Sequence, residues 1–379
     1  MFKLIDICEW NPQFLREIKG RFKLFPILVT AGISGFVQVI VFLFQLREYP
    51  DAKYPMYGGY CTLGESYGKQ IMALDNVISK FQVQIDLFYS KAYFNPAEKL
   101  KSIKAQLQAA QIQQDRLNKE LYGGYNFCPP DQIDMQTWWY DHWQYIFLSL
   151  SIIFIFTLLI AGTYLLINNL AHEERTGTLT FIRLSPQSET SILTGKILGV
   201  PILVYWFVAL AIPLHIWSGK AANASITFSH IFSYYTVLAG SCIFFFSAAL
   251  LFTLVTPFLG GFQPWLGAGA VLMFLTCALN SMVNSGSYAG AWVTIFNPID
   301  ISPIEMTRDL FPNLFTSNSS WRQEYKDYSL GKTIYFQFFF LTVKTNLFGL
   351  MGLHLASYAI WTYGIWRRLE CRFRNPIQQ

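Results

Sequence analysis

The stretch Tyr145–Leu170 reads YIFLSLSIIFIFTLLIAGTYLLINNL and contains no Asp, Glu, Lys or Arg. A helix needs roughly 20 apolar residues to cross the hydrocarbon core of a bilayer, and this stretch is longer than that. Backbone groups in lipid must be hydrogen-bonded within the chain, which a helix achieves by itself. The stretch therefore predicts a membrane-spanning helix.

Other stretches of this kind occur along the chain, and every charged residue lies in the segments between or outside these stretches. They are Leu24–Leu46, Ile197–Trp217, Ile231–Thr256, Phe262–Met282 and Thr345–Trp366. Only 13% of the 379 residues are charged and 53% are hydrophobic, whereas about a quarter of an average soluble domain is charged. We therefore expect an all-α integral membrane protein with six transmembrane helices rather than a soluble globule or a disordered chain.

The basic residues predict the orientation. With six spans, both termini lie on one side of the membrane together with the loop at 171–196. That side carries the whole net charge of +5, while the charges on the opposite side balance. Because Lys and Arg accumulate in cytoplasmic loops near the ends of spans, we expect both termini of this multi-pass protein in the cytoplasm. The membrane is expected to be the plasma (inner) membrane of a bacterium. Residues 1–23 are polar and charged, so we expect no cleavable signal peptide.

The segments between the spans receive the following assignments. They are a cytoplasmic amphipathic interfacial segment at 1–23, an external helical-hairpin domain at 47–144, a cytoplasmic loop at 171–196, an external or re-entrant segment at 283–344 and a cytoplasmic basic tail at 367–379. In the segment 283–344, prolines and an aromatic run at 335–340 predict short helices on or in the outer leaflet.

Two amphipathic helices are expected in the external domain. Ser66–Ala92 carries apolar residues at steps of three or four, and a second helix is expected to begin with Asn95 as its cap and Pro96 in its first turn. Burying the two apolar stripes against each other gives an antiparallel hairpin. Cys61 and Cys128 lie at its base on the oxidising side, which allows a disulfide between them but does not require one.

Glycine pairs at 58–59 and 123–124 flank this hairpin, each between tyrosines. Paired glycines permit sharp turns, so both segments are expected to be turns at the hairpin base. A ligand-binding or partner-binding aromatic cluster is the alternative interpretation.

No catalytic, cofactor-binding or metal-binding residue is expected. Gly331-Lys332-Thr333 resembles the end of a phosphate-binding loop but lacks its first glycine, and Thr176 stands where a zinc-protease helix starting at His172 needs its second histidine. None of the expected spans carries the Asp, Glu or Lys typical of proton-driven transport. The chain by itself is therefore not expected to be an enzyme.

The cytoplasmic loop carries the strongest functional pattern. Its segment 172–186 reads HEERTGTLTFIRLSP, an acidic and polar start followed by apolar residues and a proline that ends the helix. A second short helix then leads into the span that begins at Ile197. A short amphipathic helix of this kind could lie on the membrane or dock into a groove of a soluble partner.

This loop resembles that of the ABC-2 family of ABC-transporter membrane subunits. Members share an acidic stretch, Gly-Thr-Leu, a hydrophobic run, a proline nine residues after the glycine, and Ile-Leu-x-Gly-Lys before the next span. The matching positions here are Gly177, Thr178, Leu179, Pro186, Gly195 and Lys196. Arg175 and Thr180 stand where acidic residues are common, so ion pairs with an ATPase would differ. Six spans and an amphipathic segment before the first of them agree with the family architecture.

The resemblance implies a permease subunit of an ATP-driven exporter. It would form a dimer, either with itself or with a close homologue, in contact with membrane lipid and with separate ABC ATPase subunits that bind ATP and Mg; no nucleic acid is expected. The loop would be the coupling helix, with Gly177 allowing the turn and with Leu179 and Phe181 packed in the ATPase groove. The residues expected to contact the ATPase are Glu173, Glu174, Arg175, Gly177, Thr178, Leu179, Phe181 and Pro186.

The substrate is less constrained. Charge-free spans rich in Phe and Leu suit export of an amphipathic, lipidic or polymeric molecule from the cytoplasm, and they equally suit plain lipid contact. Two other functions stay open. One is a non-transporting ABC membrane subunit that transmits ATPase-driven motion to an external assembly, and the other is a stand-alone membrane scaffold or channel.

Overall fold

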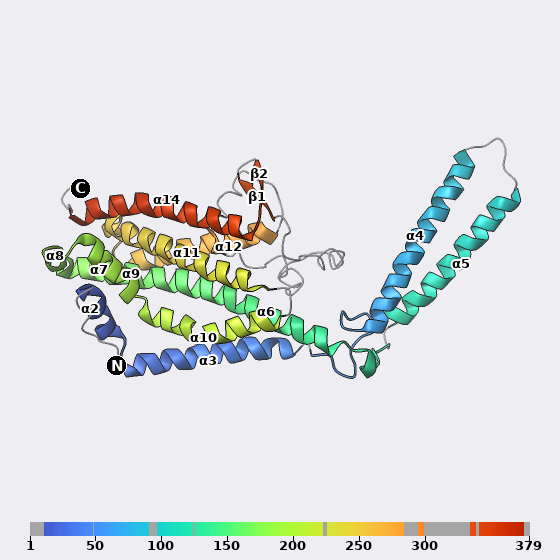
Figure 1. Cartoon of the computed structure of the whole chain (residues 1–379), viewed down its shortest axis with the longest axis horizontal. Coiled ribbons are helices and arrows are strands. Elements are labelled where there is room, and N and C mark those ends of the chain that lie inside the picture. The colour runs from blue at the N-terminus through green and yellow to red at the C-terminus, as the bar shows by residue number, and fades with distance from the viewer. Residues whose placement is uncertain are drawn as a thin grey trace. The chain divides into compact units, whose positions relative to one another are not determined.

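The computed structural model is predominantly helical and describes residues 11–47, 49–90, 97–123, 126–222, 226–283, 295–298, 334–338 and 341–374. The chain divides into two compact units: Leu46–Tyr140 forms the smaller one, and the residues before and after it form the larger one. Figure 1 labels the elements of both units.

The larger unit is a bundle of long helices with short helices at one end (Figure 1). Its elements are α2 (Pro12–Arg21), α3 (Leu24–Leu46), α6 (Met135–Phe156), the π-helical turn η2 (Thr157–Ala161), α7 (Gly162–Arg175), α8 (Thr178–Arg183), α9 (Glu189–Gly199), α10 (Ile202–Ala221), α11 (Phe228–Val255), η4 (Pro257–Phe262), α12 (Gln263–Val283), the strands β1 (Ile334–Phe338) and β2 (Leu341–Thr345), and α14 (Leu347–Arg374). The boundaries of the smaller unit fall at the end of α3 and within the first turns of α6.

Helices long and apolar enough to cross a membrane are present in the described part of the chain, and there are five of them. They are Leu24–Leu46, Met135–Arg175, Ile202–Ala221, Phe228–Val255 and Pro257–Ala278. The second runs without a break through α6, η2 and α7. The prediction of a multi-pass membrane protein is confirmed to this extent. The sixth expected span corresponds to α14, which is 28 residues long but lies outside this set of five.

The core of the bundle is built around α11. Phe246 of α11, Phe154 of α6 and Leu159 of η2 are fully buried, and α11 packs against both α7 and α14. A Cβ at Gly162 would collide with the ring of Phe246, and a Cβ at Gly267 would collide with Ile167. These glycines let α7 approach α11 and α12 closely, as small residues do at helix interfaces in membranes.

The outer face of α3 is apolar and uncovered. Leu24, Phe25, Phe36 and Phe44 each expose at least 66% of their surface. Exposure of an apolar face of this extent is unfavourable in water but favourable in lipid. The exposure of α3 therefore agrees with its assignment as a membrane span.

The segment 283–344 was expected to form short helices, and that prediction is wrong for residues 334–338 and 341–344, which are strands. Strands β1 and β2 pair antiparallel, with Ile334 opposite Thr345 and Phe338 opposite Leu341. Both strands are rich in aromatic and β-branched residues, which favour an extended backbone. The helix α14 then begins at Leu347, two residues after the expected start of the last span.

The smaller unit contains α4 (Thr62–Ser90), α5 (Ala97–Tyr122) and the short η1 (Pro130–Gln132). α4 and α5 pack side by side (Figure 1), and their contact buries Ile78 together with Ile103 and Leu117. The expected cap of the second helix, Asn95 with Pro96, lies outside the described residues.

The base of this unit is cross-linked. A disulfide joins Cys61 and Cys128, and isolated antiparallel bridges pair Pro55 with Phe127 and Cys61 with Ile133. These contacts tie the segment before α4 to the segment after α5. The smaller unit therefore has a closed base of its own.

Candidate functional site around α8

The turn between α7 and α8 is determined by its own residues. Gly177 has a φ of 74°, a left-handed conformation that glycine adopts without steric penalty. Thr176 Oγ1 donates to the carbonyl oxygen of His172 at 2.9 Å, and Thr178 Oγ1 donates to that of Glu173 at 3.2 Å. The carbonyl oxygen of His172 also accepts from the backbone N–H of Thr176 at 3.0 Å. The two threonine hydroxyls thus add hydrogen bonds to the carbonyl groups at the end of α7, where helical partners run out.

α8 has an inner and an outer face. Leu179 and Ile182, three residues apart and so on one face of the helix, are 1% and 9% exposed and belong to the hydrophobic core. Phe181 and Leu184 point outward and are 77% and 78% exposed. Leu179 was expected to pack in a partner's groove, but it packs in the core of its own chain. The apolar side chains that α8 offers to a partner are instead Phe181 and Leu184.

The charged residues before the turn, Glu173, Glu174 and Arg175, differ in how far their side chains are exposed. Glu173 is only 8% exposed and lies in an ion-pair network within the chain, so it does not face a partner as expected. Glu174 is half-buried, and Arg175 is exposed while its Nε donates to the carbonyl oxygen of Ala171. Of these expected contact residues, Arg175 has the side chain most open to a partner. Thr178 and Pro186 are exposed as well.

The C-terminal end of α8 is held by α14. The guanidinium of Arg183 lies over the ring of Phe373 at 5.2 Å, a cation–π contact. Burial lowers the pKa of Arg183 from its usual value, and the negative charge of Glu174 partly opposes this shift. The position of α8 is therefore fixed at both ends, by the Gly177 turn and by Arg183.

A buried lysine lies at the centre of the network that holds Glu173. Lys196 of α9 is 0% exposed, and its Nζ lies 2.6 Å from Glu173 Oε2 and 3.6 Å from Glu17 Oε1. The same Nζ donates to Asn169 Oδ1 at 3.0 Å. A buried charge is costly unless it is paired and hydrogen-bonded, and here Lys196 is both.

Basic residues of α2 complete the network. Arg16 Nη2 lies 3.0 Å from Glu173 Oε1, and Arg21 Nε lies 3.3 Å from Glu17 Oε2. Gln13 Nε2 donates to Glu17 Oε1 at 3.1 Å. The network thus connects α2, α7 and α9.

The start of α2 is bound to α9 by a polar contact. Asn11 Oδ1 accepts from the backbone N–H of Phe14 at 3.0 Å, which caps α2. Its Nδ2 donates to the carbonyl oxygen of Ser191 in α9 at 2.7 Å. One side chain therefore both starts α2 and attaches it to α9.

Glycines on α9 make this approach of α2 possible. A Cβ at Gly195 would lie 2.8 Å from Asn11 Oδ1 and 2.9 Å from the backbone N of Phe14, and a Cβ at Gly199 would lie 2.6 Å from Glu17 Cβ. Glycines four residues apart form a flat stripe on which a second helix can pack closely. Gly195 and Lys196, which matched the family pattern, both serve this contact with α2.

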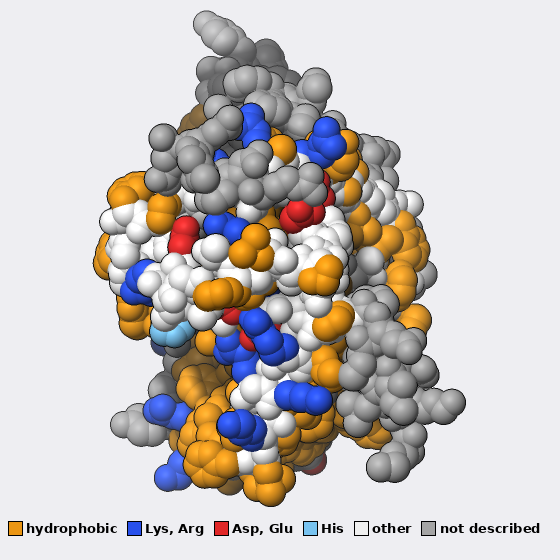
Figure 2. Space-filling model, turned by 90° about the vertical axis from the view of Figure 1, so that its left-hand side faces the viewer, with side chains coloured by type: hydrophobic (Ala, Val, Ile, Leu, Met, Phe, Trp, Pro, Cys, Tyr) orange, Lys and Arg blue, Asp and Glu red, His pale blue; other side chains and the backbone are white. Residues whose placement is uncertain are grey.

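Figure 2 shows the end of the larger unit where α2, α8 and α9 lie. Lys and Arg side chains are grouped near the centre of this face, and apolar side chains lie among and around them. Exposed basic residues of these elements and of neighbouring helix ends are Arg16, Lys19, Lys23, Arg175, Arg367 and Arg368. The face therefore combines positive charge with the exposed apolar pair of α8.

A second polar cluster lies inside the bundle, between α6, α10 and α11. His215 Nε2 lies 2.8 Å from Ser151 Oγ, and His215 Nδ1 lies 2.8 Å from Tyr235 Oη. Ser151 Oγ donates to the carbonyl oxygen of Phe147, so it accepts from Nε2–H, while Tyr235 donates to Nδ1. This arrangement suits a neutral imidazole whose ring nitrogens are both satisfied. The sequence prediction missed this cluster because His215 is a single histidine in an expected span, and its partners Ser151 and Tyr235 come from other helices.

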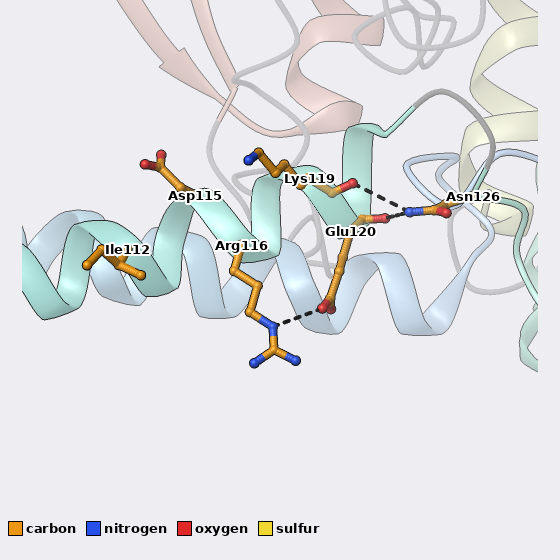
Figure 3. Close-up of a pocket in the computed structure, with 6 residues that line it drawn as sticks. All are labelled: Ile112, Asp115, Arg116, Lys119, Glu120 and Asn126. Carbon is orange, nitrogen blue, oxygen red and sulfur yellow. Dashed lines mark hydrogen bonds and ion pairs between the residues drawn. The ribbon is translucent and has the colours of Figure 1, made fainter.

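The smaller unit has a shallow hollow of about 480 Å³ beside the end of α5 (Figure 3). Its polar groups largely bind each other: Asn126 Nδ2 donates to the carbonyl oxygens of Lys119 and Glu120, and Arg116 Nε lies 3.2 Å from Glu120 Oε1. The hollow is therefore the capped end of a helix and offers little to a ligand.

Within the described ranges, no group of three or more His, Cys, Asp or Glu side chains is placed to hold a metal ion. Comparison of the chain with models of protein families, with curated proteins and with solved structures found no match.

Proposed function

We propose that this chain is the membrane subunit of an ATP-driven exporter of the ABC-2 type. It crosses the inner membrane of a bacterium six times, with α14 as the sixth span and both termini in the cytoplasm, and it works as a dimer with separate ATPase subunits. The observation that carries the proposal is the construction of α8: a helix of six residues, fixed on its inner face, that exposes Phe181 and is followed by the exposed C-cap residue Leu184. An ordinary solvated loop would not need such a fixed and apolar outer face.

The contacts of α8 supply a path for motion. Leu179 and Ile182 belong to the same core cluster as Leu166 and Leu170 of α7, and α7 continues through η2 into α6. A displacement of α8 by a partner would therefore move the span Met135–Arg175 directly, because packed interiors transmit strain.

ATP and Mg bind to the partner in this proposal, and the chain itself contributes recognition and movement rather than catalysis. Export of an amphipathic, lipidic or polymeric substrate fits spans whose outer faces are apolar, such as that of α3. The basic residues around α8 would favour an acidic rim on the ATPase, because complementary charges steer association.

Site-specific photo-cross-linking tests this proposal. A benzoylphenylalanine at position 181 or 184 is expected to cross-link, in native membranes, to a protein that is itself labelled by 8-azido-ATP. The matched control is position 112, because Ile112 is 63% exposed on α5 of the smaller unit and faces the opposite side of the membrane in the proposed topology. Cross-links at 181 and 184 that never carry the nucleotide label would refute the assignment and favour a stand-alone scaffold or channel.

A second candidate function is transmission of ATPase-driven motion to an external assembly without transport. It is favoured by the smaller unit, which is compact by itself and closed by the Cys61–Cys128 disulfide. Replacing Thr62–Tyr122 by a short Gly-Ser linker separates the two functions. If the chain is an exporter, the variant is expected to retain ATP-dependent movement of a fluorescent phospholipid in inverted vesicles. Two results together would favour the mechanical function: the intact protein shows no such movement, and the variant no longer cross-links to an external partner.

A further inference from the structure

The N-terminal helix α2 and the last turn of α7 share one buried cation. Lys196 Nζ lies within 4 Å of carboxylate oxygens of Glu17 and of Glu173, which come from segments more than 150 residues apart in the sequence. As whole residues, Glu17 and Glu173 are 7% and 8% exposed. Two carboxylates this close repel each other unless a cation lies between them, and Lys196 is the buried cation in this position. The exposed Arg16 also contacts both, with its Nη2 3.4 Å from Glu17 Oε1 and 3.0 Å from Glu173 Oε1.

Displacing one helix would therefore be costly for the others. If α2 moved away, Glu173 would lose Arg16, and Lys196 would lose Glu17. Breaking a buried ion pair by removing one partner is strongly unfavourable, because the remaining charge is left uncompensated. The charges therefore favour joint movement of α2, α7 and α9.

The packing of α2 against α9 has the same effect. Gly195 and Gly199 bring the two backbones close together, and Asn11 bonds to the carbonyl oxygen of Ser191. α2 is only two residues away from α3, and α9 leads directly toward α10. The contact between α2 and α9 thus connects the spans α3 and α10, which follow these two helices, with the Gly177 turn that carries α8.

We propose that α2 is a brace that sets the direction of α8, and that Lys196 is the positioning residue through which it acts. Glu173 is four residues before Gly177, so holding Glu173 holds the base of the turn. The inference concerns the site of the proposed function and rests on it for its biological meaning. Its physical content is that the direction of α8 depends on α2 in the chain alone.

Spin-label distances measure this dependence without a partner. Labels at Lys19→Cys on α2 and Thr180→Cys on α8, both exposed, are placed in a background that retains only Cys61 and Cys128. In detergent or nanodiscs the parent chain is expected to give a single narrow peak. Lys196→Met, which removes the charge but keeps the length of the side chain, is expected to lose that peak and give a broad distribution. Lys220→Met, at an exposed lysine of α10, is the matched control and is expected to leave the peak unchanged.

A second label pair separates bracing from general unfolding. Phe232→Cys on α11 and Ile360→Cys on α14 report on exposed positions of helices that pack together, and their distance is expected to stay narrow in Lys196→Met. An unchanged α2–α8 distance in Lys196→Met would overturn the proposal.

If both pairs broaden, Glu17→Gln decides, because it leaves the pair Lys196–Glu173 in place. Broadening of the α2–α8 distance alone in Glu17→Gln supports the brace, and an unchanged distance in that variant overturns it. These results need no ATPase. Cross-links at positions 181 and 184 that never carry the nucleotide label would refute the proposed function and leave the brace standing. Labelled cross-links together with an unchanged α2–α8 distance would overturn the brace and leave the proposed function standing.

Discussion

At the scale of single residues, glycine positions explain why the chain turns and packs as it does. Gly177 is required by its own backbone, since nothing lies within 4 Å of a Cβ built there but its φ is positive. Gly199 is required by a neighbour, since its Cβ would meet Glu17. The Gly-Thr-Leu pattern indicated the first role, whereas the second depends on a helix nearly 180 residues away in the sequence.

We expect Gly177→Ala to lower the free energy of unfolding of the larger unit by about 1 kcal/mol, because an L-residue in the left-handed region costs roughly 1–2 kcal/mol. Gly269→Ala is the matched control: it lies within α12 with open space around it and is expected to be neutral or slightly stabilising. The thermal unfolding midpoint in detergent measures both. Equal midpoints for the two variants would contradict the role of Gly177.

We expect Gly199→Leu to separate α2 from α9, because the added side chain would occupy the space of the Glu17 stem. Trypsin should then cleave faster after Lys19 and Arg21, as followed by mass spectrometry of limited digests. Gly352→Leu, at a glycine of α14 with nothing within 4 Å of its Cβ, provides the control. Unchanged cleavage rates in Gly199→Leu would show that the close contact between α2 and α9 is not needed.

At the scale of elements, sequence periodicity placed the amphipathic helices but not the direction of every face. The apolar residues of α8 were visible in the sequence, yet only the structure separates Leu179 and Ile182 inside from Phe181 and Leu184 outside. The aromatic run before α14 was interpreted as helical, although the aromatic residues of β1 and the β-branched residues of β2 favour strands. A short apolar run is ambiguous between helix and strand until its neighbours are known.

The disulfide at the base of the smaller unit yields a prediction for that element. Cys61 and Cys128 close a loop with a sequence separation of 67 residues, and a cross-link of that span stabilises by about 4 kcal/mol in the chain-entropy model. Cys61→Ser with Cys128→Ser is therefore expected to make α4 and α5 sensitive to protease, with the bundle unaffected. Gel mobility without and with reductant checks the bond itself. Reductant is expected to shift the mobility of the parent chain but not that of either single variant, Cys61→Ser or Cys128→Ser.

At the scale of the whole molecule, the charge pattern predicts an orientation that cysteine labelling can measure. A cysteine at Met72, which is 51% exposed on α4, is expected to react with an impermeant maleimide in cells whose outer membrane has been made permeable. A cysteine at Thr180 should react only after the inner membrane is opened. Labelling of both positions from the same side would rule out the proposed topology.

The sequence by itself determined that this is a multi-pass membrane protein and where its apolar helices lie. Length and absence of charge are local properties, and a bilayer demands them of each span separately. Only the tertiary structure decided which side chains of α8 remain outside, that Glu173 faces inward, and that Lys196 joins Glu17 to Glu173. The reason is physical: burial and ion pairing depend on which distant segments meet. Close packing at Gly195 and Gly199 brings those segments together.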